Sequence, residues 1–539
     1  MPRGKAVLAF LFTWISAASL AAQPYINYRG VSNAASLAPQ GLPGGGIARG
    51  SVFTIVGRNL GPAAPEVNAS PLDNELAGVS VQVIQGGVTL AAIPTSVSAS
   101  RVSAIMPSNA PLGKAALRVR FNNRSSNPAW INVVESAFGI YTINGLGFGP
   151  GVIRNYVPEA DNTTAVTARP GQTLTLKGTG LGDELAAPVE IFVGGKLAVA
   201  SQFGKAAGVD EIAFDVPADA PQGCYVPVQV RTRGATMSNA ATLAIDPEGN
   251  ACSDPFNPVG EAMRKGGRFG IVAPQRFDVL VDLQGQTEQV VIDQIDVALH
   301  QGEGGDLWFN PATSLPPVGA CTFYGGAAAT NFSDLLRLLA PQGRFLDGGA
   351  GVQLSGAGAP LTVGPREPGT LIYSAQLGRQ PGLPGSRPLF FNFPGVFNFL
   401  IPGGADVQTA RAQFETTEPV RWTNREQLAV LDRAAGLPLN WTGGDPQNDV
   451  VLIVLLSNND AANSTGLGLC VAPPGDGSFV VPPEILASLP ATASNAVRIP
   501  AWVFVGSTRA RNPVRFSAPG LDAGFIVPSQ AGGISVIVP

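Results

Sequence analysis

The residues that could carry acid–base chemistry are few in this chain. His300 is the only histidine among 539 residues, so a Ser–His–Asp triad would depend on it alone, and the chain has no Gly-x-Ser-x-Gly elbow. A glycosidase needs two carboxylates that face each other across a sugar. Neighbouring carboxylates on one strand do not by themselves straddle a substrate, so the sequence predicts a protein that is not an enzyme. The available pairs are Asp278/Asp282, Asp293/Asp296 and Asp183/Glu184.

Signals for a metal or ligand site are also weak. The loop at residues 443–449 carries Asp, Asn and Gln oxygens, which calcium could use. It lacks the D-x-D-x-D-G pattern, and Asp and Asn commonly form plain turns. Calcium stays an open alternative, and no other cofactor is predicted. Trp422 and Trp441 could form an aromatic platform for a sugar, although a Trp at a strand edge is more often part of a core.

Four cysteines, Cys224, Cys252, Cys321 and Cys470, allow three sets of pairings. We predict Cys224–Cys252 and Cys321–Cys470, because each pair then stays within one proposed domain. The rival is a zinc site, which the single histidine and the absence of a C-x-x-C motif disfavour.

The N-terminus has the pattern of an export signal. Arg3 and Lys5 precede an uncharged apolar run at residues 6–20, and small residues suit cleavage near Ala21 to Gln23. The run is shorter than the roughly 20 residues of a spanning helix. We therefore expect a secreted or cell-surface protein with no membrane span after the signal is removed, which fits the disulfides.

The composition favours many short strands joined by tight turns. The chain has 66 glycines and 47 prolines but only 13% charged residues, and apolar residues alternate between the turn residues. Its net charge of −4 opposes a nucleic-acid partner, which would usually require a basic field.

One pattern occurs twice, at residues 50–61 and 171–182. Four anchors share an offset of 121, including Gly57 with Gly178 and Gly61 with Gly182. Each copy reads as a strand that ends in a glycine-rich corner. Apolar positions shared by both copies should face inward, since side chains alternate across a strand. These inward positions are Phe53, Ile55, Leu174 and Leu176, while Lys177 should face outward.

Further anchors recur in the same order, with offsets that drift through short loop insertions. They include the Gly-Gly pairs at 86–87 and 194–195, and Ser126-Asn127 with Ser238-Asn239. Arg118, Arg120 and Arg231 fall on outward positions, which we interpret as a solvated face rather than a basic recognition patch.

Each copy resembles an IPT/TIG domain, an immunoglobulin-like β-sandwich, in its apolar strand, its "G.GLG" corner, its "VP…AP.G" approach and its closing "SN". The pair is similar to a recurring, uncharacterised module of secreted soil-bacterial proteins, which also carries "NAAS" (33–36 here) and a "FGIYTINGLGFGPGVI" connector (138–153 here). The resemblance covers about residues 29–247 and implies an all-β fold. TIG domains also occur in transcription factors, a rival that the export signal and the acidic balance oppose.

The predicted organisation is a signal peptide (1–22), module 1 (23–136), module 2 with its connector (137–247), a linker (248–270) and a β-rich region (271–539) of one larger or two smaller sandwiches. In this last region, residues 277–283 and 290–299 read as strands, and 450–456 reads as a strand covered on both faces. Short helices are expected at 333–339 and 483–489.

Taken together, these patterns predict tandem immunoglobulin-like sandwiches followed by a larger β-sandwich region, with no catalytic role. The expected role is extracellular binding, adhesion or structure, with an extracellular protein or a polysaccharide as the partner. The alternative is a carbohydrate-binding protein or a glycoside hydrolase and its accessory module.

Overall fold

The computed structural model of the chain describes residues 23–539 with internal gaps. These gaps are 43, 144, 146, 183–188, 233–235, 253–261, 263–266, 284–285, 303–314, 317, 326–342, 357, 366–370, 380–385, 392, 460–463, 493–500 and 510–511. The described part is all-β apart from short helical turns, as predicted. Helix α4 (Pro483–Ser488) begins with a proline where the sequence predicted one. The expected signal peptide and the helix at 333–339 lie outside the described residues.

Module 1 is a sandwich in which strand β7 pairs with both sheets, so that a single strand path surrounds one apolar core. Phe53 and Ile55 are fully buried in that core, which confirms the predicted inward face. Its strands are β1 (Tyr25–Asn33), β2 (Ile47–Ala48), β3 (Val52–Arg58), β4 (Glu66–Val67), β5 (Glu75–Leu76), β6 (Val79–Gln85), β7 (Val88–Val97), β8 (Arg101–Ile105), β9 (Gly113–Phe121), β10 (Arg124–Ser125) and β11 (Ala129–Val134).

Module 2 repeats this architecture with two separate sheets around a second core. Leu174 and Leu176 point into the core, whereas Lys177 points outward and lies 3.1 Å from Glu211. Its strands are β12 (Gly139–Ile140), β13 (Gly149–Pro150), β14 (Ile153–Asn155), β15 (Ala160–Asp161), β16 (Thr173–Thr179), β17 (Val189–Val193), β18 (Lys196–Ala198), β19 (Ala200–Ala206), β20 (Val209–Asp215), β21 (Gly223–Thr232), β22 (Thr236–Met237) and β23 (Ala241–Ile245).

The repeated Ser-Asn pair makes equivalent hydrogen bonds in both modules. The hydroxyl of Ser126 accepts a hydrogen bond from the backbone N–H of Val119, and that of Ser238 accepts one from Val230. The asparagine that follows each serine fixes the first strand of its module. Asn127 bonds both the N–H and the carbonyl of Ile26. Asn239 bonds both groups of Ile140 and also the carbonyl of Gly147.

The two modules are joined through a buried side-chain amide. Asn33, at the end of β1, donates hydrogen bonds to the carbonyls of Ala137 and Thr179 in module 2, at 3.0 Å each. Its carbonyl oxygen accepts the N–H groups of Ala35 and Ser36, so the "NAAS" turn holds the amide in place. The hydroxyl of Thr179 in turn accepts the N–H of Val52 in module 1, so the contact is reciprocal.

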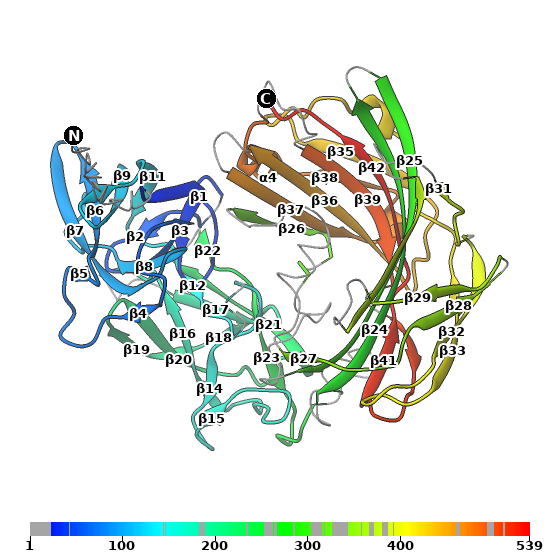
Figure 1. Ribbon diagram of the computed structural model, residues 1–539. Helices are drawn as coiled ribbons and strands as arrows, with labels where there is room; N and C mark the ends of the chain where they lie inside the picture. Colours follow the sequence, from blue (N-terminus) through cyan, green and yellow to red (C-terminus); the bar gives the residue numbers. More distant parts are fainter. Residues whose placement is uncertain are drawn as a thin grey trace, which may run out of the picture.

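The C-terminal region is built on one long bent sheet with the strand order β26-β37-β36-β39-β42-β24-β25-β30-β31. Figure 1 shows this sheet at the right and the two modules at the left. The predicted strands at 277–283 and 290–299 lie in its central hairpin, and 450–456 is buried as expected. Its strands are β24 (Arg268–Leu283), β25 (Gln286–Gly302), β26 (Ala320–Gly325), β27 (Gly343–Phe345), β30 (Ile372–Arg379), β31 (Ser386–Arg387), β36 (Val450–Asn459), β37 (Ser464–Ala472), β39 (Ala501–Thr508), β40 (Val514–Phe516), β41 (Ala523–Ile526) and β42 (Ser529–Ser535).

Two smaller sheets cover one face of the long sheet and create two apolar cores. Val272 and Leu280 of β24 have the same strand parity but belong to different cores, so both cores lie on that one face. The region is therefore one sheet that serves two sandwiches. The first smaller sheet contains β28 (Val352–Ser355), β29 (Leu361–Val363), β32 (Gly395–Ile401) and β33 (Ala410–Thr416), and the second contains β34 (Arg421–Trp422), β35 (Leu437–Thr442) and β38 (Ser478–Val481). The division of the whole chain into independent domains stays a prediction.

Module 1 also contacts the C-terminal region directly. The guanidinium of Arg29 in β1 donates hydrogen bonds to the carbonyl of Ala487 and the hydroxyl of Ser488 in α4. Leu42 packs against the core that the long sheet forms with the second smaller sheet. Through β1, module 1 is therefore attached both to module 2 and to α4.

We predict that Asn127→Ala and Asn239→Ala lower the stability of the module in which each lies. Each change leaves backbone groups of the first strand without partners, which costs roughly 1–3 kcal/mol. Asn239→Ala should have the larger effect, because it removes three hydrogen bonds rather than two. Calorimetric unfolding measures the effect, with exposed Gln202→Ala as the control. Equal transition temperatures in all four proteins would contradict the assignment.

Candidate functional site

A row of polar side chains crosses the covered face of the long sheet. Ser507 in β39 lies opposite Gln530 in β42, which lies opposite Arg276 in β24, which lies opposite Asp293 in β25. The two apolar cores lie on either side of this polar row. We call this row of Ser507, Gln530, Arg276 and Asp293 the seam, because it separates the cores beneath the two small sheets.

Asp293 is fully occupied by structural contacts. Its carboxylate accepts two hydrogen bonds from Arg276, at 2.7 and 2.8 Å, and one each from the backbone N–H groups of Phe390 and Phe391. Three of these bonds end on Oδ2 and one on Oδ1, so both oxygens of the carboxylate are held by structural contacts. A buried charge needs such compensation to be tolerated. Arg276 also lies over the ring of Phe393.

The other carboxylate pairs from the sequence do not form a glycosidase site in the described residues. Asp293 and Asp296 are three residues apart on β25 and therefore point to opposite faces of the sheet. Asp296 accepts hydrogen bonds from Gln294 and Ser374. Asp278 shares a strand face with Asp282, but it accepts the amide of Gln289 and lies 3.3 Å from Arg425. Asp183 and Glu184 lie outside the described residues.

His300 is a core residue in this structure. It is 2% exposed, and its ring lies between those of Phe269 and Phe345, with centroid distances of 5.6 and 5.0 Å. Burial lowers the pKa of its imidazole, because the charged form loses hydration. The neutral ring therefore packs among aromatics rather than serving as a general base for a surface serine.

The predicted tryptophan platform is wrong, because both rings are buried. Trp422 and Trp441 lie directly opposite each other on β34 and β35 and belong to the core beneath the second small sheet. Their indole N–H groups donate to Asn424 and to the carbonyl of Pro474, which satisfies the polar edge of each buried ring. Neither ring can stack on a sugar.

A small polar pocket opens at the seam. Its walls include Glu415, Thr417, Asp449, Arg509 and Gln530. The volume open to the centre of a water molecule is about 10 Å³, which is room for about one water. The pocket is thus too small for a sugar, and a bound water would suit the Nε of Arg509, which is buried without a partner in the described structure.

In the loop at residues 443–449, the carboxylates accept hydrogen bonds that stabilise the loop's own turn. Asp445 accepts the backbone N–H of Gln447 and the side-chain amide of Asn448, and the latter bond is the main reason that its pKa is lowered. Asp449 accepts the hydroxyl of Thr417 at 3.0 Å, and burial raises its pKa. Among the described residues, no three His, Cys, Asp or Glu side chains are grouped as metal ligands would be. Calcium binding stays an untested prediction.

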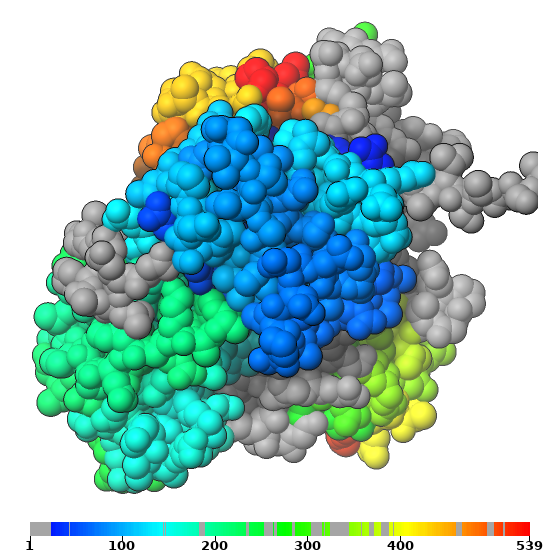
Figure 2. Space-filling model, turned by 90° about the vertical axis from the view of Figure 1, so that its left-hand side faces the viewer, coloured from blue at the N-terminus to red at the C-terminus, as the bar shows by residue number. Residues whose placement is uncertain are grey.

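A larger hollow lies between the two modules. The volume open to water centres is about 380 Å³, within the range of roughly 300–1,000 Å³ for small-molecule sites. Asn132, Ser136 and Thr232 supply polar groups to it, and Leu112 and Val134 supply apolar surface. Figure 2 shows that module 1, coloured blue to cyan, forms a broad face of the molecule.

Beside this hollow stands a residue that the sequence analysis missed. Trp130 on β11 is 61% exposed and lies two positions from Asn132 on the same strand face. Lys114 on β9 lies over its ring, with Nζ 4.7 Å from the centroid. The sequence contained a signal for this exposure. Apolar and other residues alternate from 129 to 133, which places Trp130 and Asn132 together on the outward side of the strand.

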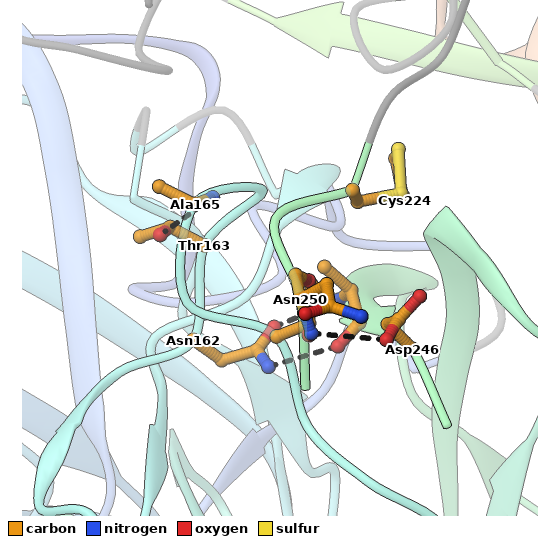
Figure 3. The surroundings of a disulfide bond; sticks show 9 residues. Asn162, Thr163, Ala165, Cys224, Asp246 and Asn250 are labelled. Carbon is orange, nitrogen blue, oxygen red and sulfur yellow. Dashed lines mark hydrogen bonds between the residues drawn. A yellow bond between two sulfur atoms is a disulfide. The ribbon is translucent and has the colours of Figure 1, made fainter. Parts of the chain in front are cut away.

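The structure contains both predicted disulfides. Cys321 and Cys470 lie opposite each other on the paired strands β26 and β37. Cys224 on β21 is joined to Cys252, and so fixes the beginning of the expected linker to module 2. Figure 3 shows how Asp246 supports this attachment by accepting the backbone N–H of Asn250.

The chain matches no protein-family model and no curated protein. Solved structures resemble it only distantly. A surface glycan-binding protein of Prevotella bryantii is 15% identical over 41% of each chain, with a TM-score of 0.15. A surface glycan-binding protein of a Bacteroides ovatus mixed-linkage glucan locus is 13% identical over 37% of this chain and 45% of its own, with a TM-score of 0.20. The bacterial integrin-binding protein invasin is 11% identical over 92% of this chain and 78% of its own, with a TM-score of 0.13.

This chain thus spans less than half the length of the two glycan-binding proteins. With TM-scores this low, none of these likenesses carries an argument about fold or ligand. The fold described above rests on the strands and cores of this chain itself.

We predict that Asp449→Asn changes how stability depends on pH. Burial raises the folded-state pKa of Asp449 above its usual value of 3.8. The neutral acid is therefore favoured by folding, and its contribution is complete below the unfolded pKa and is lost as pH rises through the folded pKa. The variant should gain more stability than the wild type when the pH is raised from 4 to 7. Urea unfolding at both values tests this, and identical gains would contradict it.

Proposed function

We propose that this chain is a secreted, non-catalytic binding protein whose modules present a stiff surface to an extracellular protein or polysaccharide. The observation that carries the proposal is the double attachment of module 1. Asn33 fixes it to module 2 through buried hydrogen bonds, and Arg29 fixes it to α4. A surface held in one orientation loses less conformational entropy on binding than a mobile one.

Extracellular localisation is part of this proposal. It is supported by the two disulfides, which persist in oxidising compartments, and by the export pattern at the N-terminus. Among the described residues, no helix is long and apolar enough to cross a membrane. The finer assignments, an IPT/TIG origin for the modules and boundaries at 23–136, 137–247 and 271–539, belong to the proposal as well.

The enzymatic alternative is weakened by what the candidate residues do. Both carboxylate oxygens of Asp293 accept structural hydrogen bonds, and His300 lies between two aromatic rings. The carbohydrate-binding alternative is compatible with the proposal, since a polysaccharide is one of the two partner classes. It requires a surface other than that of the buried Trp422 and Trp441.

We predict that the chain purified from residue 23 retains extracellular polysaccharides or surface proteins without altering them. A glycan array and a pull-down from cell-surface extracts measure retention, and release of reducing ends measures cleavage. Asp278→Asn is the control for cleavage, because Asp278 is one of the candidate acids and its side chain is 39% exposed. Cleavage that Asp278→Asn abolishes would overturn the non-catalytic role, and absence of any ligand in both assays would overturn the binding role.

A further inference from the structure

The outward face of module 1 is strongly positive. Side chains alternate along a strand, so β9 turns Lys114, Arg118 and Arg120 to the outside while Leu117 and Val119 enter the core. None of the three cations forms an ion pair with a carboxylate among the described residues. We call the outward side chains of β6, β9 and β11 the outer face of module 1. They are Ser80, Gln82, Ile84, Lys114, Ala116, Arg118, Arg120, Trp130, Asn132 and Val134.

These ten side chains include no carboxylate, although the chain as a whole carries a net charge of −4. Glu75 of β5 borders them, because it lies opposite Ser80 at the edge of the same sheet. Module 2 supplies an internal comparison. Arg231 follows Val230 on β21 as Arg120 follows Val119 on β9. Arg231 lies opposite Glu190 and pairs with it at 2.6 and 2.8 Å, whereas Arg120 lies opposite Ser80. Arg231 is thus paired with a carboxylate, whereas in module 1 Arg120 donates to the neutral Asn123 and Arg118 donates to the carbonyl of Ser126.

Trp130 adds a stacking surface to the same face. Its cross-strand neighbour is the small Ala116, and on the far side of Ala116 lies Ile84. An isolated exposed apolar residue needs no explanation, but here the ring lies diagonally across from Lys114 and Arg118, the cations that flank Ala116 on the outer side of β9. Lys114, held over the ring, is placed to meet an anionic group on whatever stacks beside it.

The hollow between the modules continues this face. Asn132 lies opposite Lys114 at the end of the β9–β11 pair and lines the hollow. The hydroxyls of Ser136 and Thr232, 3.0 Å apart, lie on its far wall. Glu135 is the one carboxylate among the residues that line the hollow. The amide, the hydroxyls and the nearby flat ring are suited to a sugar, whose rings present apolar faces and whose hydroxyls need hydrogen-bond partners.

We propose that the outer face of module 1 and the adjoining hollow bind an acidic polysaccharide, one whose sugar rings carry carboxylates. One sugar stacks on Trp130, and the carboxylates of the chain meet Lys114, Arg118 and Arg120. These cations span about 20 Å along β9, which suits an extended polymer rather than a single sugar. A neighbouring sugar occupies the hollow against Asn132. This assignment rests on the proposed role in extracellular binding and names its ligand class and its site.

A single-stranded nucleic acid also combines negative charge with rings that stack. The polysaccharide is favoured because the chain carries an export pattern and a net negative charge. Nucleic acid is therefore an outcome of the test that would overturn the proposal.

The experiment measures binding of the chain from residue 23 to polygalacturonate, to neutral dextran and to a single-stranded oligonucleotide by isothermal titration calorimetry at low and high salt. The variants are Trp130→Ala and the triple change Lys114→Gln, Arg118→Gln and Arg120→Gln. Tyr156→Ala, an exposed aromatic of module 2, controls for the first, and Arg231→Gln controls for the second. The transition temperature of each variant confirms that it is folded.

We expect polygalacturonate to bind, with affinity falling at high salt because charge pairs at an exposed surface are screened. Trp130→Ala should weaken binding about tenfold, comparable to the loss of one stacked ring, and the triple change should weaken it by more than tenfold. Both controls should stay within about twofold of the wild type. Dextran should bind far more weakly than polygalacturonate.

The proposal is overturned if polygalacturonate does not bind, if both variants bind it as tightly as the controls, or if the oligonucleotide binds as tightly with the same dependence on the variants. Its failure is distinguishable from failure of the proposed function. A chain that retains another extracellular ligand, with Trp130→Ala unaffected, remains a binding protein whose site lies elsewhere.

Discussion

The buried amide of Asn33 is the contact on which the arrangement of the modules depends. Its two donors reach the carbonyls of Ala137 and Thr179, and its acceptor is used within its own turn. The approach is close enough to require glycine on the facing corner. A Cβ at Gly180, whose φ is +108°, would lie 2.2 Å from the carbonyl oxygen of Ala137. Gly180, whose counterpart in module 1 is Asn59, thus permits the modules to dock through backbone as well as side chains.

The sequence predicted the parts of the fold that depend on local alternation. It identified the inward faces through Phe53 and Leu174, because one strand carries that information by itself. It also paired the cysteines correctly, with Cys321 and Cys470 in one region and Cys224 joined to Cys252 at the start of the adjoining linker. The seam of the long sheet was not predicted, because its contacts join residues that are distant in the sequence. Arg276 and Asp293 become neighbours only when β24 and β25 form a long hairpin, and Phe390 and Phe391 reach Asp293 from a distant loop.

The same reasoning explains the errors at the candidate site. Trp422 and Trp441 were candidates for a sugar platform, although a Trp at a strand edge is more often part of a core. Their two strands pair and place both rings in one core. Trp130 lies on a strand whose partner β9 leaves that face uncovered. Whether a tryptophan is buried or exposed therefore depends on which sheet covers it, which the strand's own residues do not specify. The outward arginines were interpreted as a solvated face, and only the pairing of Arg231 with Glu190 reveals that the two modules differ there.

Duplication separates what the fold needs from what it leaves free. Ser126 and Ser238 make the same bond to their strands, so this position is fixed by architecture. The outward side chains of β9 and β21 do not belong to the apolar core. They can therefore be substituted without loss of the sandwich fold. A difference between the copies at such positions is therefore free of structural constraint. Trp130 and three cations are concentrated on module 1, beside a hollow that Thr232 of module 2 helps to line. On that face, the demands of binding can act independently of those of folding.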